Sequence, residues 1–250
     1  MTVASPVVFG AADPRFSLEY QVARGDWRRA VLPVCCCERF EDALPVRQFH
    51  FEKGLRSFAG WWYFATTATH VGFESWLERD HLMLMDFDPR VSAVSSQPFW
   101  LRWRDEAGKT RRHVPDFFVR RDDGAGVVVD VRPDDRIPVR DAEVFAVTAS
   151  ACELAGWEYR RVGDLDPVLV ANVRWLSRYR HSRCGVPEIA EALMEVFAQA
   201  RGLFDGATAV GERLGVLPVL FHLMWRGRLR ANLSGGPLGS STIVRTGGRR

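Results

Sequence analysis

Lysine is nearly absent from this chain of 250 residues, since it occurs only at Lys53 and Lys109 and arginine supplies almost all other positive charge. Cysteine is sparse as well. The five cysteines include no CxxC spacing, which argues against a zinc site, and their odd number argues against a disulfide framework. No apolar run approaches the length of a membrane span, and the first residues lack the basic region of a secretory signal. We therefore expect a cytoplasmic protein with reduced thiols and no membrane partner.

The charge of the chain is unevenly distributed. A net charge of +3 is too weak to indicate a nucleic-acid partner by itself. Residues 157–250, however, carry 14 Arg against 8 Asp and Glu, a balance of +6, which leaves −3 for residues 1–156. Because 47% of the residues are hydrophobic, the chain can bury a sizeable core, so its function has to be argued from motifs.

The middle of the chain predicts an alternation of helices and strands. Apolar residues of Phe73–Asp86 recur at spacings near 3.6, which indicates a helix. Three strands separated by turns are expected to follow as a meander, at Gln97–Trp103, Arg112–Val119 and Gly126–Arg132. The next elements are a helix at Asp141–Ala155, a strand at Trp157–Val162 and a helix at Pro167–Tyr179. This order predicts an α/β fold with the meander at its centre.

The two ends of the chain differ from this pattern. Residues 1–46 are irregular, with a possible strand at Arg29–Cys35. After an amphipathic helix at Pro187–Arg201, the segments Ala207–Leu214 and Leu217–Arg228 resemble a helix-turn-helix joined at Gly215, and the tail LSGGPLGSSTIV could form a β-wing. We therefore divide the chain into an N-terminal extension (1–46), a central α/β domain (47–182) and a winged-helix-like domain (183–250).

Acidic residues on neighbouring strands indicate a metal site. Asp116 follows Pro115 in one expected strand, and Asp130 lies in the next. A short hairpin would place the two carboxylates side by side, where they repel unless a cation lies between them. Oxygen ligands of this kind suit Mg²⁺ or Mn²⁺, which can activate water for phosphate hydrolysis. Side chains alternate along a strand, so Arg132 shares the face of Asp130 and could contact the phosphate. The alternative is that such acids only flank turns or form salt bridges.

Two longer stretches resemble a known family. FESWLERDHLMLMDFDPRVSAVSSQPFWLRW is similar to the TnsA N-terminal signature of S-x-x-E, an apolar helix, D-P-x-V and Q-P. RRHVPDFFVRRDDGAGVVVDVR, which comes next, resembles that family's R-x-x-P-D-F-x-V, turn and E-V-K segment. The resemblance covers roughly residues 48–180. It implies a restriction-endonuclease-like PD-(D/E)xK core of helix, three-strand meander, helix and strand.

The resemblance also implies roles for individual residues. Glu78 of Ser75-x-x-Glu78 matches the helix carboxylate of the metal site, and Glu74, one turn earlier, is the reserve candidate. Asp116 matches the metal-binding Asp, and Asp130 stands where the family has Glu or Gln. The implied metal ligands are Asp116, Asp130, Glu78 and the carbonyl of Val131, while Gln97 matches the Q-P position.

Arg132 departs from the family pattern, which has Lys at this position. Arginine keeps the positive charge and can hold a phosphate, but it cannot deprotonate water, because its pKa stays above about 12. We expect the Arg132 side chain to point toward the metal site. Without metal it should pair with Asp116, Asp130 or Glu78.

Several basic residues are candidates for DNA contact. Residues 47–70 mix aromatic and basic side chains, which suits a nucleic-acid surface, although the aromatics could equally pack on the core. The C-terminal run Arg226-Gly227-Arg228-Leu229-Arg230 could face phosphates or an acidic protein. The predicted DNA-binding residues are Arg47, Lys53, Arg56, Arg112, Arg226, Arg228 and Arg230.

The sequence thus predicts a metal-dependent DNA endonuclease that cleaves transposon ends. By resemblance, its partners would be a transposase of the DDE type, which cuts and joins the other strand, and an AAA+ ATPase regulator. Two alternatives stay open. One is a weakened nuclease fold that serves as a scaffold for DNA and transposase, and the other is a stand-alone nuclease of the restriction type.

Overall fold

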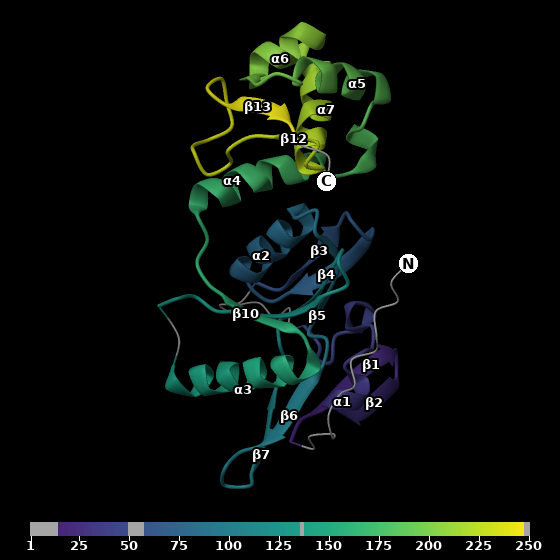
Figure 1. Ribbon diagram of the computed structural model, residues 1–250, viewed down its shortest axis with the longest axis vertical. Coiled ribbons are helices and arrows are strands. Elements are labelled where there is room, and N and C mark those ends of the chain that lie inside the picture. The colour runs from purple at the N-terminus through teal and green to yellow at the C-terminus, as the bar shows by residue number, and fades with distance from the viewer. Residues whose placement is uncertain (1–14, 50–57, 136–137, 248–250) are drawn as a thin grey trace, which may run out of the picture. The chain divides into compact units, whose positions relative to one another are not determined.

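The computed structural model describes residues 15–49, 58–135 and 138–247 (Figure 1). It divides into two compact units that interleave along the sequence. Unit 1 comprises Met1–Trp61, Val71–Glu78 and Arg90–Gly163, and unit 2 comprises Trp62–His70, Arg79–Pro89 and Asp164–Arg250. Across the described ranges, no helix is both long and apolar enough to cross a membrane.

Unit 1 contains a four-stranded antiparallel sheet with the order β2-β1-β6-β7. Its strands are β1 (Ser17–Ala23), β2 (Asp26–Val31), β6 (Trp100–Arg104) and β7 (Thr110–His113). Successive side chains alternate between the two faces, so Leu18, Tyr20 and Leu101 are buried on one face. They pack into a core with Phe40 and Trp157, which leaves the other face of the sheet outward.

A second sheet of unit 1 has the order β10-β9-β8-β5. Its strands are β5 (Val91–Ser96), β8 (Phe117–Arg121), β9 (Gly126–Val131) and β10 (Glu158–Val162). All of β9 is buried, as expected for the run GVVVDV in the middle of a sheet. The parallel pair β9 and β10 is joined by helix α3 (Val139–Ala155), which ends at Gly156 with a φ of 71°, a value that favours glycine.

The meander that the sequence predicts is wrong in one respect. The stretch Arg112–Val119 is not one strand, because β7 ends at His113 and β8 begins at Phe117 in the other sheet. Pro115 lies in this break, where its missing N–H costs no ladder hydrogen bond. Gln97 is likewise not in a strand. It has a φ of 49° in the connection from β5, a strand not predicted, to β6.

The shorter elements also differ from prediction at their ends. The expected strand Arg29–Cys35 is β2 up to Val31 and then helix α1 (Leu32–Cys35), with proline in its first turn. A 3-10 turn, η1 (Phe40–Asp42), follows, and then the hairpin of β3 (Gly60–Phe64) and β4 (Thr69–Phe73). Helix α2 runs over Trp76–Phe87, so Phe73 belongs to β4.

The C-terminal part of unit 2 is mainly helical. It contains α4 (Pro167–Leu176), η2 (Ser177–Tyr179), η3 (Ser182–Cys184), α5 (Pro187–Val196), α6 (Leu203–Val210) and α7 (Arg213–Trp225). Three short strands form an antiparallel sheet with the order β11-β13-β12, from β11 (Arg201–Gly202), β12 (Leu229–Arg230) and β13 (Ile243–Thr246). Gly215 is not the expected joint, because it lies inside α7 and the turn falls at Gly211 and Glu212.

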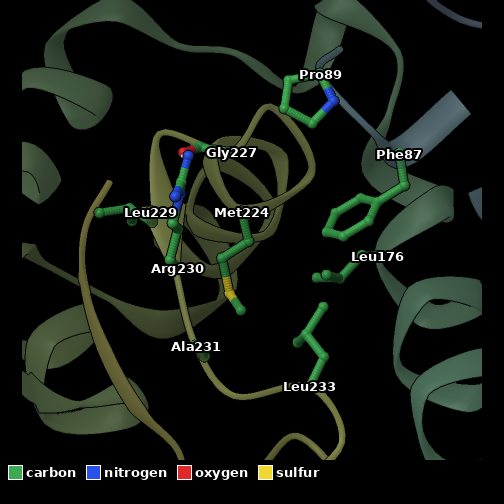
Figure 2. Close-up of a pocket in the computed structure, with 9 residues that line it drawn as sticks. All are labelled: Phe87, Pro89, Leu176, Met224, Gly227, Leu229, Arg230, Ala231 and Leu233. Atoms are coloured by element: carbon green, nitrogen blue, oxygen red, sulfur yellow. Dashed lines mark hydrogen bonds between the residues drawn. The ribbon is translucent and has the colours of Figure 1, made fainter. Parts of the chain in front are cut away.

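An apolar cavity of about 280 Å³ lies in unit 2 (Figure 2). Phe87, Leu176, Met224 and Leu233 are among the residues that line it. Among the described candidate residues predicted from sequence, only Arg230 lines this cavity, and none of the candidate acidic residues does. The chemistry predicted from sequence therefore has to be sought in unit 1.

Candidate active site

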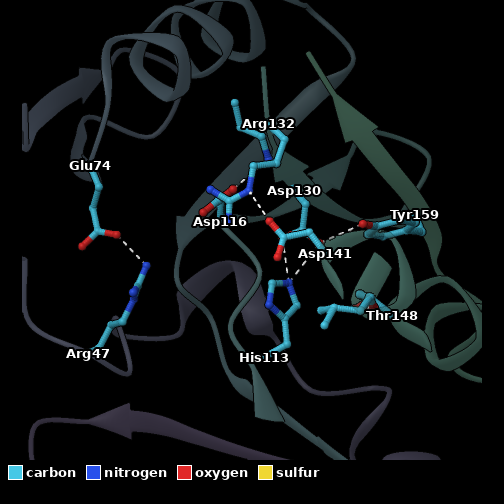
Figure 3. A network of polar contacts seen from close by, with 11 residues as sticks. Arg47, Glu74, His113, Asp116, Asp130, Arg132, Asp141, Thr148 and Tyr159 are labelled. Atoms are coloured by element: carbon cyan, nitrogen blue, oxygen red, sulfur yellow. Dashed lines mark hydrogen bonds and ion pairs between the residues drawn. The ribbon is translucent and has the colours of Figure 1, made fainter. Parts of the chain in front are cut away.

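A polar pocket of about 390 Å³ in unit 1 collects most of the candidate residues. It lies where α2 begins, β7 and β9 end and β8 begins. Figure 3 shows several of its side chains. The predicted residues in its lining are Arg47, Glu74, Glu78, Arg112, Asp116, Asp130, Val131 and Arg132. Segments far apart in sequence thus converge on one polar cavity.

Asp116 directly precedes β8, and it lies next to Asp130. The pairing of Phe117 with Val129 continues toward these two residues, and the Val131 N–H donates a hydrogen bond of 2.7 Å to Asp116 Oδ2. Burial, first of all, raises the pKa of the Asp116 carboxyl well above its ordinary value, and the charges of Glu78 and Asp130 raise it further. The Val131 N–H and the Arg132 charge oppose that rise. A nearby cation would stabilise the charged form of this carboxyl.

Asp130 is held by two residues that sequence reasoning missed. Its carboxylate is buried, at 2% exposure. His113 Nε2 lies 2.9 and 3.0 Å from its two oxygens, and the Tyr159 hydroxyl donates a hydrogen bond of 2.9 Å (Figure 3). Burial, and then the adjacent Asp130 charge, raise the pKa of Tyr159. His113 comes from β7, so this contact ties the two sheets of unit 1 together.

Glu78 occupies a capping box at the start of α2. The Ser75 hydroxyl accepts from the Glu78 N–H at 3.1 Å and donates to Glu78 Oε1 at 2.8 Å. Glu78 Oε2 accepts from the Glu74 N–H at 2.6 Å. Both carboxylate oxygens therefore satisfy groups at the helix start, a known role of the S-x-x-E pattern. Burial raises the pKa of Glu78, while these hydrogen bonds oppose the rise.

Arg132 lines the pocket, but its ion pair differs from the one expected. The guanidinium Nε lies 3.5 Å from the Asp141 carboxylate of α3, which the prediction did not name as a partner. The Arg132 side chain is half-exposed, so this pair is weak. Glu74, the reserve candidate, is paired with Arg47.

The donor types in this pocket fit a hard divalent cation, because Asp116, Asp130 and Glu78 offer carboxylate oxygens. Their side chains are nevertheless turned to other partners. Within the described part of the chain, no group of three or more His, Cys, Asp or Glu is arranged to hold a metal ion. Asp130 faces His113 and Tyr159, and Glu78 faces the helix start, so metal binding would have to replace some of these hydrogen bonds.

His113 and Tyr159 had only weak signals in the sequence. His113 stands three residues before Asp116 in RRHVPD, and Tyr159 follows Glu158 at the start of a short strand. Neither position belongs to a spacing that indicates chemistry. They acquire a role only because β7 and β10, which belong to different sheets, both bring a side chain to Asp130.

The other predicted DNA-binding residues lie elsewhere. Lys53 and Arg56 fall outside the described residues. In unit 2, Arg226, Arg228 and Arg230 are exposed, and Arg230 stands directly opposite Arg245 in the β12–β13 pair. The buried Leu229 lies between two of these arginines, so the basic run also anchors its strand in the core.

One family model matches a segment that contributes to this pocket. Residues 88–164 match the family model described as TnsA-like endonuclease N terminal. The matched segment includes Asp116, Asp130 and Arg132 together with both residues that hold Asp130. No curated protein matches the chain. The mixed α/β fold of unit 1 fits the nuclease fold that this family model describes. Residues 88–164 are therefore similar to the N-terminal domain of TnsA-like endonucleases.

Proposed function

We propose that this protein is a DNA endonuclease dependent on Mg²⁺ or Mn²⁺ that hydrolyses phosphodiester bonds at transposon ends. The observation that carries the proposal is the position of Asp116. Its partly buried carboxyl lies among Asp130, Glu78 and Arg132. Asp116, Asp130 and Arg132 belong to the segment that matches the TnsA-like family model. Carboxylates gathered at this density repel one another, and a divalent cation relieves that repulsion.

Each pocket residue receives a role in this proposal. Asp116, Asp130, Glu78 and the Val131 carbonyl would hold the metal, with Glu74 in reserve. When bound, such a metal activates water and polarises the phosphate. Arg47, Arg112 and Arg132 supply positive charge around the pocket and would hold a DNA phosphate. His113 and Tyr159 orient the Asp130 carboxylate.

The C-terminal region is proposed to be a winged-helix-like domain with a binding role. Its order of helix, short strand, two helices and two further strands supports this proposal, with the residues between β12 and β13 as the wing. Arg226, Arg228 and Arg230 would contact DNA phosphates. A transposase of the DDE type and an AAA+ ATPase regulator are the proposed protein partners.

Metal-dependent nicking of supercoiled plasmid tests the nuclease proposal. Wild type should convert the plasmid to the nicked form in Mn²⁺ or Mg²⁺ and not in EDTA. Asp116→Asn, which keeps an acceptor for the Val131 N–H, should be inactive but normally folded. Nicking by Asp116→Asn at the wild-type rate would contradict the proposal.

The scaffold alternative is favoured by a specific pair of observations. Both oxygens of Glu78 are engaged in the helix cap, and Arg132 stands where the family has Lys. A protein of this kind would bind DNA and transposase without cutting. Absence of nicking by wild type and Arg132→Lys, both with transposase present, would support this alternative.

A further inference from the structure

The outward face of the β2-β1-β6-β7 sheet collects arginine side chains. Residues paired across an antiparallel sheet share a face, and Ser17 and Glu19 alternate with the buried Leu18 and Tyr20. The registers place Arg29 opposite Glu19, Arg102 opposite Ser17 and Arg112 opposite Arg102. Arg104 lies on the same face, two residues after Arg102.

This face carries an excess of positive charge that the protein itself does not neutralise. Among the registered positions it holds Arg29, Arg102, Arg104 and Arg112 against the single acid Glu19. Glu19 is paired with Arg102 at 2.6 Å. Within the described residues, Arg29 and Arg104 have no ion pair or side-chain hydrogen bond, and both are exposed. Arg102 Nε is buried without a hydrogen-bond partner in the same part of the chain.

The arginines of the opposite face behave differently. Arg28 is paired with Asp26, and Arg111 is paired with Asp105. Their positions in the registers, opposite Tyr20 and Trp103, place them on the other side of the sheet. The unpaired charge of this sheet is therefore concentrated on its outward face.

The outward face is continuous with the candidate active site. Arg112 lies over the Trp100 ring, 4.2 Å from its centroid, and both residues line the acidic pocket. The next residue of β7, His113, contacts Asp130. The end of β7 therefore belongs to the arginine face and to the pocket at once.

We propose that this face, defined by Arg29, Arg102, Arg104 and Arg112, binds the phosphate backbone of duplex DNA and leads it to the pocket. The proposal rests on the proposed nuclease function. The face crosses four neighbouring strands, which span roughly 14 Å, and duplex DNA carries one negative charge per about 1.7 Å of its axis. Several phosphates can therefore lie on this face at once. Phosphate contacts of this kind position the DNA without reading its sequence.

The test compares two double variants that remove equal charge. Arg29→Gln/Arg104→Gln alters exposed residues outside the pocket, and Arg28→Gln/Arg111→Gln is the matched control on the opposite face of the same sheet. Binding of a fluorescein-labelled duplex of mixed sequence is measured by anisotropy, in EDTA and at several salt concentrations. The first pair should weaken binding and lower the slope of log affinity against log salt by about 1 per arginine. The control should leave the slope unchanged.

Three results would overturn the proposal. These are an unchanged slope in the first pair, an equal loss in both pairs, or no DNA binding by wild type. Plasmid nicking in Mn²⁺ separates the two hypotheses. If wild type nicks the plasmid but Arg29→Gln/Arg104→Gln does not change the salt dependence of binding, the arginine face is rejected and the nuclease proposal stands. If the variants alter DNA binding as expected but wild type does not nick, the arginine face stands and the nuclease proposal is rejected. DNA affinity that both pairs leave intact would point to an acidic protein as the occupant of this face.

Discussion

At the scale of the residue, Arg132 shows how far strand alternation predicts a side chain. Its position on the Asp130 face placed it at the pocket, and the structure has it there. Alternation could not predict its partner. Arg132 lies just beyond β9, and α3 brings Asp141 within 3.5 Å of the guanidinium. The helix that follows a strand therefore decides where a long side chain at the strand end is held.

Arg132→Lys should raise metal-dependent nicking, because lysine is the residue that the TnsA-like pattern has at this position. Stability should change by less than about 1 kcal/mol, since the exposed pair with Asp141 contributes little. Asp141→Asn is the control, because it releases Arg132 without supplying a lysine. Equal nicking rates of wild type and Arg132→Lys would show that arginine supports nicking as well as lysine at this position.

Glu78→Gln should distinguish the role of Glu78 in the helix cap from its proposed role as a metal ligand. Glutamine can still accept from the Glu74 N–H and bond with the Ser75 hydroxyl, so the melting temperature should stay near that of wild type. Glu78→Ala should lose about 0.5–2 kcal/mol of stability, as other lost caps do. If Glu78 also binds metal, Glu78→Gln lowers nicking although the protein stays folded. Nicking at the wild-type rate would assign Glu78 to the cap alone.

At the scale of the element, the sequence predicted the second half of unit 1 better than the first. The run GVVVDV, the helix after it and β10 lie close to the expected positions, because each has a strong period and a clear end. The pattern of Arg112–Val119 predicts a single strand, because nothing in it indicates that the sheet changes at Pro115. Sequence patterns describe local burial, and they do not say which sheet provides it.

Asp86 of α2 should make unit 2 depend on pH. Its carboxylate accepts from Trp62 Nε1 at 3.0 Å and from the backbone of Ala65 at 2.9 Å, while burial raises its pKa. The folded protein therefore binds a proton here more tightly than the unfolded chain. The resulting stability is fully present below the ordinary pKa, roughly 3.9, and is lost as pH rises through the raised value.

Asp86→Asn tests whether the stabilisation from Asp86 decreases as pH rises. The variant should be less stable by about 1–3 kcal/mol, because Asn has a single acceptor oxygen, whereas Asp86 accepts from Trp62 Nε1 with one oxygen and from the Ala65 N–H with the other. Its deficit relative to wild type should shrink as pH rises from about 4, since only wild type ionises this group. Denaturant unfolding at a series of pH values measures the difference. A deficit that widens with pH would mean that the Asp86 pKa is lowered.

At the scale of the whole molecule, the C-terminal helices share a core with the helix before them. Val170, Val173 and Leu176 of α4 are buried in one cluster with Leu220 and Met224 of α7. The sequence predicts a domain boundary at residue 183, where the chain is rich in turn residues. The turn residues at this boundary do not indicate that residues of α7 pack against α4.

Deletion of residues 187–250 should therefore destabilise the remainder of unit 2 and cause more than a loss of binding. The shortened chain should expose the apolar side of α4, bind the dye ANS and lose amide protection in α4. Arg230→Gln/Arg245→Gln removes charge from the β12–β13 pair without uncovering the core, so it should fold normally. A monomeric shortened chain with native protection in α4 would contradict this expectation.

The central claim is that Asp116, Asp130 and Glu78 together hold a catalytic divalent cation. The most direct measurement is calorimetric titration of Mn²⁺ into wild type, Asp116→Asn, Asp130→Asn and Glu78→Gln, each first shown to be folded. The account predicts saturable Mn²⁺ binding by wild type, with affinity lowered at least tenfold by each substitution, or about 1.4 kcal/mol. Wild type that binds no Mn²⁺, or variants that bind it equally well, would contradict the account.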